Sequence, residues 1–482
     1  MNFLIFYLLC TQILCYNILP WGYLEMRKNV DLLHGPVLSS LTRLALPIMA
    51  TSLVQMAYNL TDMIWIGRIG SNAVAAVGAA GMYMWLSNGL ATLAKMGGQV
   101  NVGHALGAGQ KADASRYAAN AFQLTAFCGI IYGLLCVLLN GPLIGFFRLN
   151  SPAVIADAKI YLQITCGFVI FSFLNQTFTG ILTAVGNSRS SFLATSAGLV
   201  INIVLDPVLI FGLGPFPEMG VMGAAIATVI AQLIVTLMFF YFASKDTQVF
   251  RNMKVAEKPR RKYMMPVIKI GLPTSIQSII FTGMSMIIAR LVAGYGDAAI
   301  AVQKVGSQIE SISWMTADGF AAAVNSFVAQ NHGAGNRTRI KKGYTSAMGV
   351  VLVWGVICTL LLILCPAPIF RIFISEPDVL PMGVDYLMIL GVSQLFMSVE
   401  ITTAGAFAGF GRTVPPSVVG IVLTAARIPF AMLLTETVLG LNGIWWSITI
   451  SSICKGIILL IWFLVFLKQK EQKEEQKGPD PS

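Results

Sequence analysis

The sequence predicts an all-α membrane protein with twelve transmembrane helices in two related six-helix lobes. Its 482 residues are 56% hydrophobic and only 11% charged, with a mean hydropathy of +0.75, whereas a soluble domain carries roughly 25% charged residues. Apolar runs of about twenty residues, the length that crosses a bilayer, recur along the whole chain. The runs are continuous rather than alternating, so helices are favoured over a closed barrel, the other fold that satisfies the backbone in lipid. An internal repeat then divides the runs into two halves.

The apolar runs define the spans in chain order. They are predicted at residues 40–68, 75–106, 117–145, 158–186, 191–213, 220–243, 264–293, 299–332, 344–373, 380–410, 415–438 and 442–467. The chain therefore divides into an N-terminal extension and lead-in (1–38), a first lobe (39–243), a linker (244–263), a second lobe (264–467) and a tail (468–482). Residues 1–25 carry no early positive charge, which argues against a signal peptide. We expect them to lie outside the lobes, with translation starting at either Met1 or Met26.

The net charge of +11 reflects topology rather than a nucleic-acid partner. Lys and Arg gather in alternate loops, above all in the linker 244–263, and the positive-inside rule places such loops in the cytoplasm. We therefore expect a multi-pass protein of the plasma membrane with both termini cytoplasmic. The eight Cys residues lie singly, without metal-ligand spacing, so no disulfide framework is expected.

An internal repeat relates the two halves. One constant shift in numbering, which we call the first repeat shift, aligns Leu46-Pro47 with Leu272-Pro273, and Gly107-Ala108-Gly109 with Gly333-Ala334-Gly335. A shift that is shorter by one, the second repeat shift, then pairs Tyr161 with Tyr386, Gly180 with Gly405, and Gly186 with Gly411. Six spans is an even number, so both halves have one orientation and are related by a pseudo-two-fold axis along the membrane normal. Many secondary transporters build an alternately opening central cavity in this way, so the repeat predicts transport.

Two carboxylates within the first half are the leading candidates for chemistry. Asp62 falls in the first span, where an ionised side chain is costly and is functional by default. Tyr58 and Gln55 lie at i−4 and i−7 on the same helical face. Asp206 lies in the fifth span with Asn202 at i−4, and the proline that follows Asp206 frees a backbone carbonyl.

This cluster can bind either Na⁺ or a proton. Two carboxylates, an amide oxygen and a free carbonyl are hard oxygen ligands of the kind that Na⁺ prefers. A Na⁺ site is therefore possible at Asp62, Asn202 and Asp206. Alternatively the cluster holds a proton, because two nearby carboxylates repel each other and burial disfavours their charged form. The structural alternative for either carboxylate is a pair with Lys95 in the second span.

The second half lacks this constellation. Ile288 stands in the place of Asp62, and Arg427 stands near the place of Asp206. We therefore expect the cation site in the first lobe. Lys304 and Glu310 of the second lobe are expected to pair with each other, or else to face the cavity.

Several marks together resemble the multidrug and toxic compound extrusion (MATE) family. They are Leu46-Pro47, Asn59-Leu60-Thr61-Asp62, Gly107-Ala108-Gly109, Asn202 with Asp206-Pro207, and Gly411-Arg412-Thr413. The resemblance covers roughly residues 30–467 and is closest to the prokaryotic, DNA-damage-inducible type. It implies a V-shaped fold and export of small organic, often cationic, compounds in exchange for H⁺ or Na⁺. It also implies a hydroxyl from the sixth span at the cation site, for which Thr228 is the candidate.

Residues for the substrate cavity or for gating are also predicted. Pro47 can bend the first span beside the cavity. Met56 and Met284 are flexible thioethers of the kind that suits varied substrates, and Gln55 and Gln277 are polar candidates for the same cavity.

No catalytic motif, nucleotide-binding motif or cofactor signature accompanies these residues. The sequence therefore predicts a transporter rather than an enzyme, without a cofactor, acting in the lipid bilayer on drugs or toxic metabolites, as a monomer. Two alternatives stay open. One is a flippase for lipid-linked sugars, which needs a strongly basic cavity, and the other is a membrane-embedded transferase.

Overall fold

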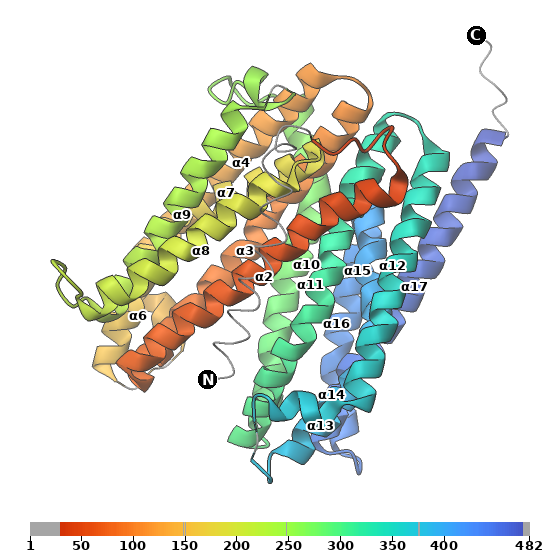
Figure 1. The fold of residues 1–482 in the computed structure, drawn as a ribbon. Helices are drawn as coiled ribbons and strands as arrows, with labels where there is room; N and C mark the ends of the chain where they lie inside the picture. The colour runs from red at the N-terminus through yellow and green to blue at the C-terminus, as the bar shows by residue number, and fades with distance from the viewer. Residues whose placement is uncertain (1–28, 148, 150, 247, 375, 476–482) are drawn as a thin grey trace.

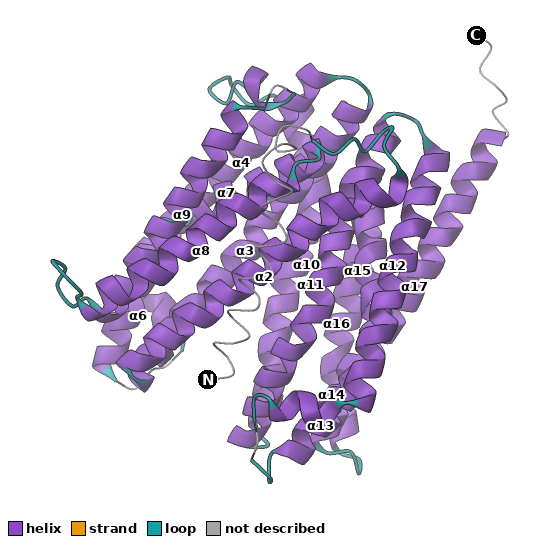
Figure 2. Ribbon diagram, viewed as in Figure 1, coloured by secondary structure: helices purple, strands orange, loops and turns teal. Residues whose placement is uncertain are grey.

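The structure, a computed structural model, describes residues 29–147, 149, 151–246, 248–374 and 376–475. The expectations for residues 1–25 and for the end of the tail lie outside these residues. Every regular element in the described ranges is a helix, and none is a strand (Figure 2). The predicted all-α class is confirmed.

Each half contributes its helices in chain order. The first lobe contains α2 (Val37–Ile69), α3 (Ser71–Gly107), α4 (Lys111–Leu138), α5 (Asn140–Gly145), α6 (Pro152–Gly167), α7 (Ile170–Val185), α8 (Ser188–Phe211) and α9 (Gly220–Ser244). The linker carries the 3₁₀ turn η1 (Phe250–Asn252). The second lobe contains α10 (Arg261–Ala293), α11 (Asp297–Gly333), α12 (Arg337–Leu364), α13 (Pro366–Arg371), α14 (Leu380–Gly391), α15 (Gln394–Gly409), α16 (Val414–Thr435) and α17 (Leu441–Glu475).

These helices form twelve spans. Eight of them are long and apolar enough to cross a membrane alone, namely α2, α4, α8, α9, α10, α12, α16 and α17. The pairs α6–α7 and α14–α15 each make one span, bent by 43° and 46°. The remaining two spans are α3 and α11, which have 37 residues each and so exceed the roughly 20 residues that a crossing needs. The predicted layout of two six-helix lobes is therefore confirmed.

Four spans differ in detail from the prediction. The spans predicted at 117–145 and 344–373 end at Leu138 and Leu364, and each is followed by a short helix of less than two turns. The fourth and tenth spans are bent directly after Gly167 and Gly391. Glycine is a poor helix former, which favours a break at these two positions. The breaks recur at matching places because the two halves repeat one architecture.

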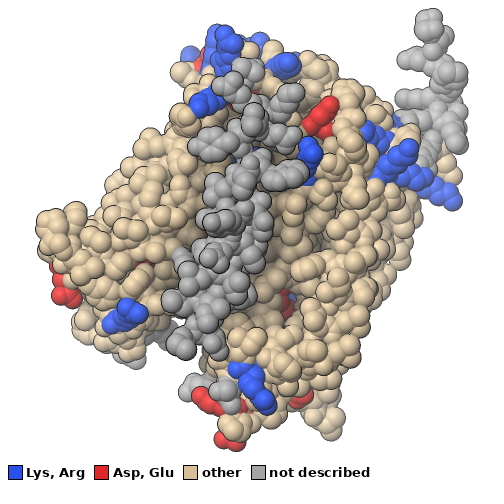
Figure 3. All heavy atoms as spheres, in the orientation of Figure 1, with Lys and Arg blue, Asp and Glu red and all other residues tan. Residues whose placement is uncertain are grey.

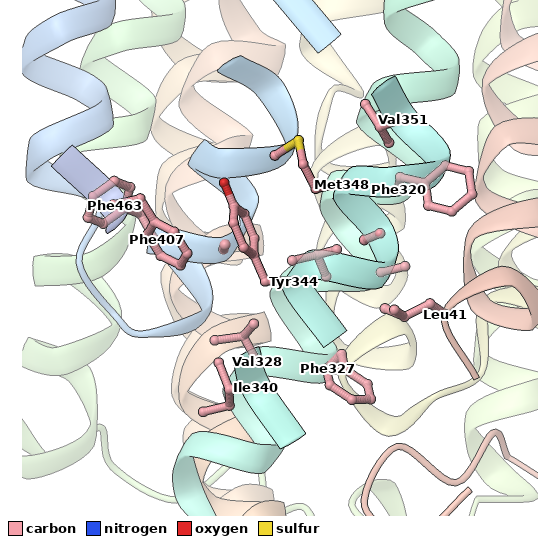
Figure 4. Packing of buried hydrophobic residues seen from close by; sticks show 14 of the residues in the cluster. Leu41, Phe320, Phe327, Val328, Ile340, Tyr344, Met348, Val351, Phe407 and Phe463 are labelled. Atoms are coloured by element: carbon pink, nitrogen blue, oxygen red, sulfur yellow. The ribbon is translucent and has the colours of Figure 1, made fainter. Parts of the chain in front are cut away.

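The lobes converge at one end of the molecule and diverge toward the other (Figure 1). The converging end carries the linker 244–263 and the loops that follow α3 and α11, and we call it the linker end. One large buried apolar cluster lies mainly in the second lobe and includes Phe327, Tyr344, Phe407 and Phe463 (Figure 4). Leu41 of α2 belongs to the same cluster. The first turns of α2 therefore tie the first lobe to the second.

Helices α3 and α11 cross each other at the linker end with almost no space between their backbones. A Cβ atom built on Gly107 would lie 1.8 Å from the carbonyl oxygen of Gln330. A Cβ built on Gly333 would lie 2.0 Å from the carbonyl oxygen of His104. Because these two pairs are related by the first repeat shift, the same contact is made twice about the pseudo-two-fold axis. Glycine at both positions is what allows the helices to approach so closely.

A short segment before α2 also joins the two lobes at this end. The Val30 amide donates to the carbonyl of Gly186, between α7 and α8 (3.0 Å). The carbonyl of Leu32 accepts from Asn331 Nδ2 of α11 (3.0 Å) and from Arg339 Nε of α12 (3.2 Å). The Leu32 side chain is itself buried. Residues 29–36, which we call the strap, thus hold both lobes together.

Candidate functional site

A cluster of polar side chains lies inside the first lobe, away from the other lobe. Asn202 and Asp206 come from α8 and are fully buried, and Asn202 Nδ2 donates to Asp206 Oδ1 at 3.0 Å. Tyr58 and Asp62 reach them from α2, and Thr228 from α9. The Tyr58 phenol is close enough to Asp62 and Asp206 to interact electrostatically with both, and α9, which carries Thr228, packs against α8 and α2.

The geometry follows from helical spacing. Tyr58 and Asp62 are one helical turn apart, as are Asn202 and Asp206, so each pair presents two polar groups from one helical face. Helices α2 and α8 pack along each other, which brings the two pairs together. The structure therefore brings together all five residues that the sequence analysis assigned to the cation site.

Several oxygen atoms of this cluster have no hydrogen-bond partner, and its two carboxylates form no ion pair with any described residue. Buried atoms without a hydrogen-bond partner are the Tyr58 hydroxyl, Asp62 Oδ1, Asn202 Oδ1, Asp206 Oδ2 and Thr228 Oγ1. A buried polar atom normally has a partner, because leaving it without one costs about 1–3 kcal/mol. Oxygen atoms from three helices that converge without partners form a set that can accept a small cation or a proton.

One member of this site was missed by the sequence analysis. Tyr161 of α6 is buried and interacts electrostatically with Asp62, Tyr58 and Asp206. Its repeat partner Tyr386 had already marked the position as one that both halves keep, but that match gave no sign of contact with the carboxylates. A tyrosine near the start of a span is hard to distinguish from an interfacial aromatic residue.

The predicted Lys304–Glu310 pair is wrong, and the alternative pair of Lys95 with a first-lobe carboxylate is not formed. Lys95 interacts electrostatically with Asp318 of α11, in the other lobe, rather than with Asp62 or Asp206. This follows from the topology, because α3 packs against α10 and α11 across the lobe interface. Lys304 is exposed, while Glu310 lies in the interior of the second lobe, where it interacts with Arg427. Lys304 and Glu310 therefore do not pair, and Glu310 does not face the space between the lobes.

The residues predicted for the cavity lie in different environments. Gln55 is exposed, and the Met56 sulfur accepts from Ser311 Oγ of α11 at 3.5 Å, so Met56 lies between the lobes. Met284 is half-buried on α10. Gln277 turns into its own lobe, where its amide nitrogen lies 2.4 Å from the Cβ position of Gly420. Pro47 lies within a continuous α2.

The corresponding place in the second lobe is apolar. Ile288, at the repeat position of Asp62, packs in one buried cluster with Ala431. By the second repeat shift, Ala431 is the partner of Asp206. The helix contact that holds the two carboxylates in the first lobe is thus repeated in the second lobe, where the residues at the contact are apolar.

Comparison with known proteins identifies the family. The family model described as MatE matches residues 47–208 and residues 273–433, once in each lobe. The two matches begin at Pro47 and Pro273, which are partners by the first repeat shift found in the sequence.

Three curated relatives cover most of this chain. The probable multidrug resistance protein NorM of Thermotoga maritima is 29% identical over 427 residues, which is 88% of this chain and 91% of the relative. The FAD transporter of Shewanella oneidensis is 23% identical, covering 90% of this chain and 95% of that protein. The multidrug export protein MepA of Staphylococcus aureus is 25% identical, covering 89% and 94%.

Solved structures show the same fold. An outward-facing multidrug resistance MATE family transporter of the MOP superfamily superposes with a TM-score of 0.84 at 24% identity, covering 92% of this chain and 98% of the other. A MATE crystal structure in the bent conformation gives a TM-score of 0.85 at 24% identity, covering 92% and 99%. Because the family model matches both lobes in register and over more than half of the sequence, this chain belongs to the MatE family, a family of multi-pass membrane transporters.

Proposed function

We propose that this protein is a secondary active multidrug exporter that moves small organic, often cationic, compounds out of the cell in exchange for H⁺ or Na⁺. The observation that carries the proposal is the set of unpartnered oxygens on Tyr58, Asp62, Asn202, Asp206 and Thr228 inside the first lobe. The names of the Thermotoga and Staphylococcus relatives support multidrug export. The chain acts without a cofactor and as a monomer, and the coupling ion is its co-substrate.

The orientation proposed is with the linker end in the cytoplasm of a plasma-membrane protein, and both termini on that side. The basic side chains on the face shown in Figure 3 gather mainly toward the linker end. The linker alone contains Lys258, Arg260, Arg261 and Lys262. Such an excess of Lys and Arg on one side of the membrane is typical of the cytoplasmic side.

In the proposed cycle, an entering cation neutralises Asp62 of the first lobe. Neutralisation removes the cost of a charge held in a low-dielectric interior, and α2 can then bend at Pro47, where the carbonyl of Arg43 has no amide donor within the helix. Bending would draw Met56 and its neighbours away from α11 and change the space between the lobes. The cation and the substrate drive this equilibrium only by their different affinities for the two states.

The proposal is tested by efflux from proteoliposomes under an imposed H⁺ or Na⁺ gradient, with ethidium as substrate. Asp62→Asn and Asp206→Asn should abolish gradient-driven efflux while ethidium still binds. Asp157→Asn, on α6 of the same lobe, is the matched control and should transport normally. Normal pumping by both site variants would refute the first-lobe mechanism.

Thr228→Val identifies the coupling ion. The Thr228 hydroxyl contributes a ligand oxygen to a sodium site, whereas proton binding needs only the carboxylates. Sodium-driven efflux should therefore fall in this variant, and proton-driven efflux should continue.

FAD is a second substrate to test, because the Shewanella relative carries the name of an FAD transporter. Accumulation of FAD without export of ethidium in the same vesicles would replace the multidrug assignment.

A further inference from the structure

The interior of the second lobe holds four charged side chains that the first-lobe site does not use. They are Glu310 of α11, Glu400 of α15, Arg427 of α16 and Lys455 of α17, which are 9, 9, 9 and 6% exposed. All four lie on membrane-spanning helices, where an ionised side chain is costly unless it has a partner. Two anions and two cations make the group neutral overall. We call it the second-lobe charge network.

One direct ion pair and longer-range electrostatic interactions join the members of this network. Lys455 Nζ lies 3.0 Å from Glu400 Oε1 in a buried ion pair. Arg427 interacts electrostatically with both Glu400 and Glu310. The remaining oxygens Glu400 Oε2 and Glu310 Oε1 have no hydrogen-bond partner of their own, so the nearby guanidinium and ammonium groups are what balance their charge.

The two cations are held in place by their helices. Arg427 Nε donates to Ser451 Oγ at 2.5 Å, and its Nη2 donates to Ser452 Oγ at 3.1 Å, both on α17. Lys455 follows one turn later on the same helix, on the face that meets Glu400. The positive charge is therefore fixed to the protein and cannot exchange with solvent.

The repeat makes the contrast between the lobes specific. By the second repeat shift, Arg427 occupies the position of Asn202. In the first lobe the amide at this position leaves Asp206 Oδ2 without a partner. In the second lobe the guanidinium at this position brings its own positive charge to the helix interface.

We propose that Lys455, with Arg427 beside it, acts as a tethered cation that keeps Glu400 ionised and leaves no place for H⁺ or Na⁺ at that carboxylate. One consequence of this proposal rests on the proposed function. It is that ion coupling is confined to the first lobe, because the second lobe already holds its cations. A buried ion pair tolerates replacement of both partners by neutral groups, whereas loss of one partner strands the other as a buried charge.

The test measures the melting temperature of the purified full chain as a function of pH, in sodium and in choline salts. The background carries Asp62→Asn and Asp206→Asn, so that the first lobe contributes no ion dependence. Lys455→Met should lower the melting temperature, and lowering the pH should restore it, because a proton on Glu400 replaces the lost ammonium. Glu400→Gln should show the opposite sign, since the stranded Lys455 is more stable as the neutral amine at high pH. The titratable group that faces this pair, Arg427, and the groups next to it, Glu310 and Tyr386, are the same in every variant.

The double variant Glu400→Gln/Lys455→Met is the matched control, and should melt near the background temperature with the same dependence on pH and sodium as the background. If both single variants fail to fold while the double variant and Lys455→Arg fold, the pairing of charges is supported equally. Three results would overturn the proposal. In the first, the melting temperatures of the single variants depend on pH no more than that of the background. In the second, the double variant cannot fold, and in the third, the melting temperature of the background depends on sodium and this dependence disappears in the double variant. Failure of the first-lobe mechanism would appear instead in efflux by Asp62→Asn and Asp206→Asn, which this experiment does not measure.

Discussion

The glycine crossing of α3 and α11 can be opened by adding a single methyl group. In Gly107→Ala the new Cβ would lie 1.8 Å from the Gln330 carbonyl oxygen, whereas carbon–oxygen contacts normally lie near ~3.4 Å. The helices must therefore separate by roughly 1.5 Å at this point. Overpacking of this kind costs about 1–3 kcal/mol. The state in which the linker end is closed should lose about 5- to 150-fold in population relative to the alternative state.

The assay is the distance between spin labels at Lys111 and Thr345, in a variant without the native cysteines. Both residues are exposed and lie at the linker end, one in each lobe. Gly333→Ala should shift the distances as Gly107→Ala does, because its Cβ would lie 2.0 Å from the repeat-related carbonyl of His104.

Gly81→Ala is the matched control, since a Cβ on this α3 residue meets nothing within 4 Å. It should leave the distance distribution unchanged. Should Gly107→Ala and Gly333→Ala both give the distribution of the control, close backbone packing would not be what holds the linker end closed.

Two further predictions concern topology and the strap. A cysteine at Asn72 should react with a membrane-impermeant thiol reagent added outside intact cells, and a cysteine at Lys258 should not; labelling at Lys258 alone would invert the orientation. Arg339→Met removes the guanidinium hydrogen bonds to the carbonyls of Leu32 and Gly35, and hydrogen bonds from charged donors contribute about 1.5–3 kcal/mol. It should therefore shift the same spin-label distances toward the open linker end, and an unchanged distribution would show that the strap does not bias the equilibrium.

The spans were predictable because membrane crossing imposes long apolar runs that any single sequence displays. The bends after Gly167 and Gly391 were not, since so short a break does not interrupt an apolar run. The short helices after Leu138 and Leu364 were absorbed into the preceding spans for the same reason. Length and apolarity fix how many times the chain crosses, but not where it bends.

The candidate site was predictable within each helix and less so between helices. The i, i+4 spacing placed Tyr58 with Asp62 on one face, and the site that they form with α8 followed from the family resemblance. The interaction of Lys95 with Asp318 was not foreseen because neighbours of α3 belong to the other lobe, and nothing in the local sequence indicates them. The second-lobe charge network was missed for a related reason. Its members lie on four helices, and the paired Glu400 and Lys455 belong to different spans, α15 and α17.

The composition of α3 and α11 has a consequence for how the protein is made. Both helices bury amide side chains. Gln99 Nε2 of α3 donates to Ser326 Oγ of α11 across the lobe boundary (3.0 Å). Asn325 Nδ2 of α11 likewise contacts Met96 Sδ of α3 (3.2 Å). The partners in both pairs belong to opposite halves of the sequence, so Gln99 of α3 gains Ser326 only after the second half of the chain has been made. The polar contacts across the lobe boundary are therefore completed only when α11 inserts.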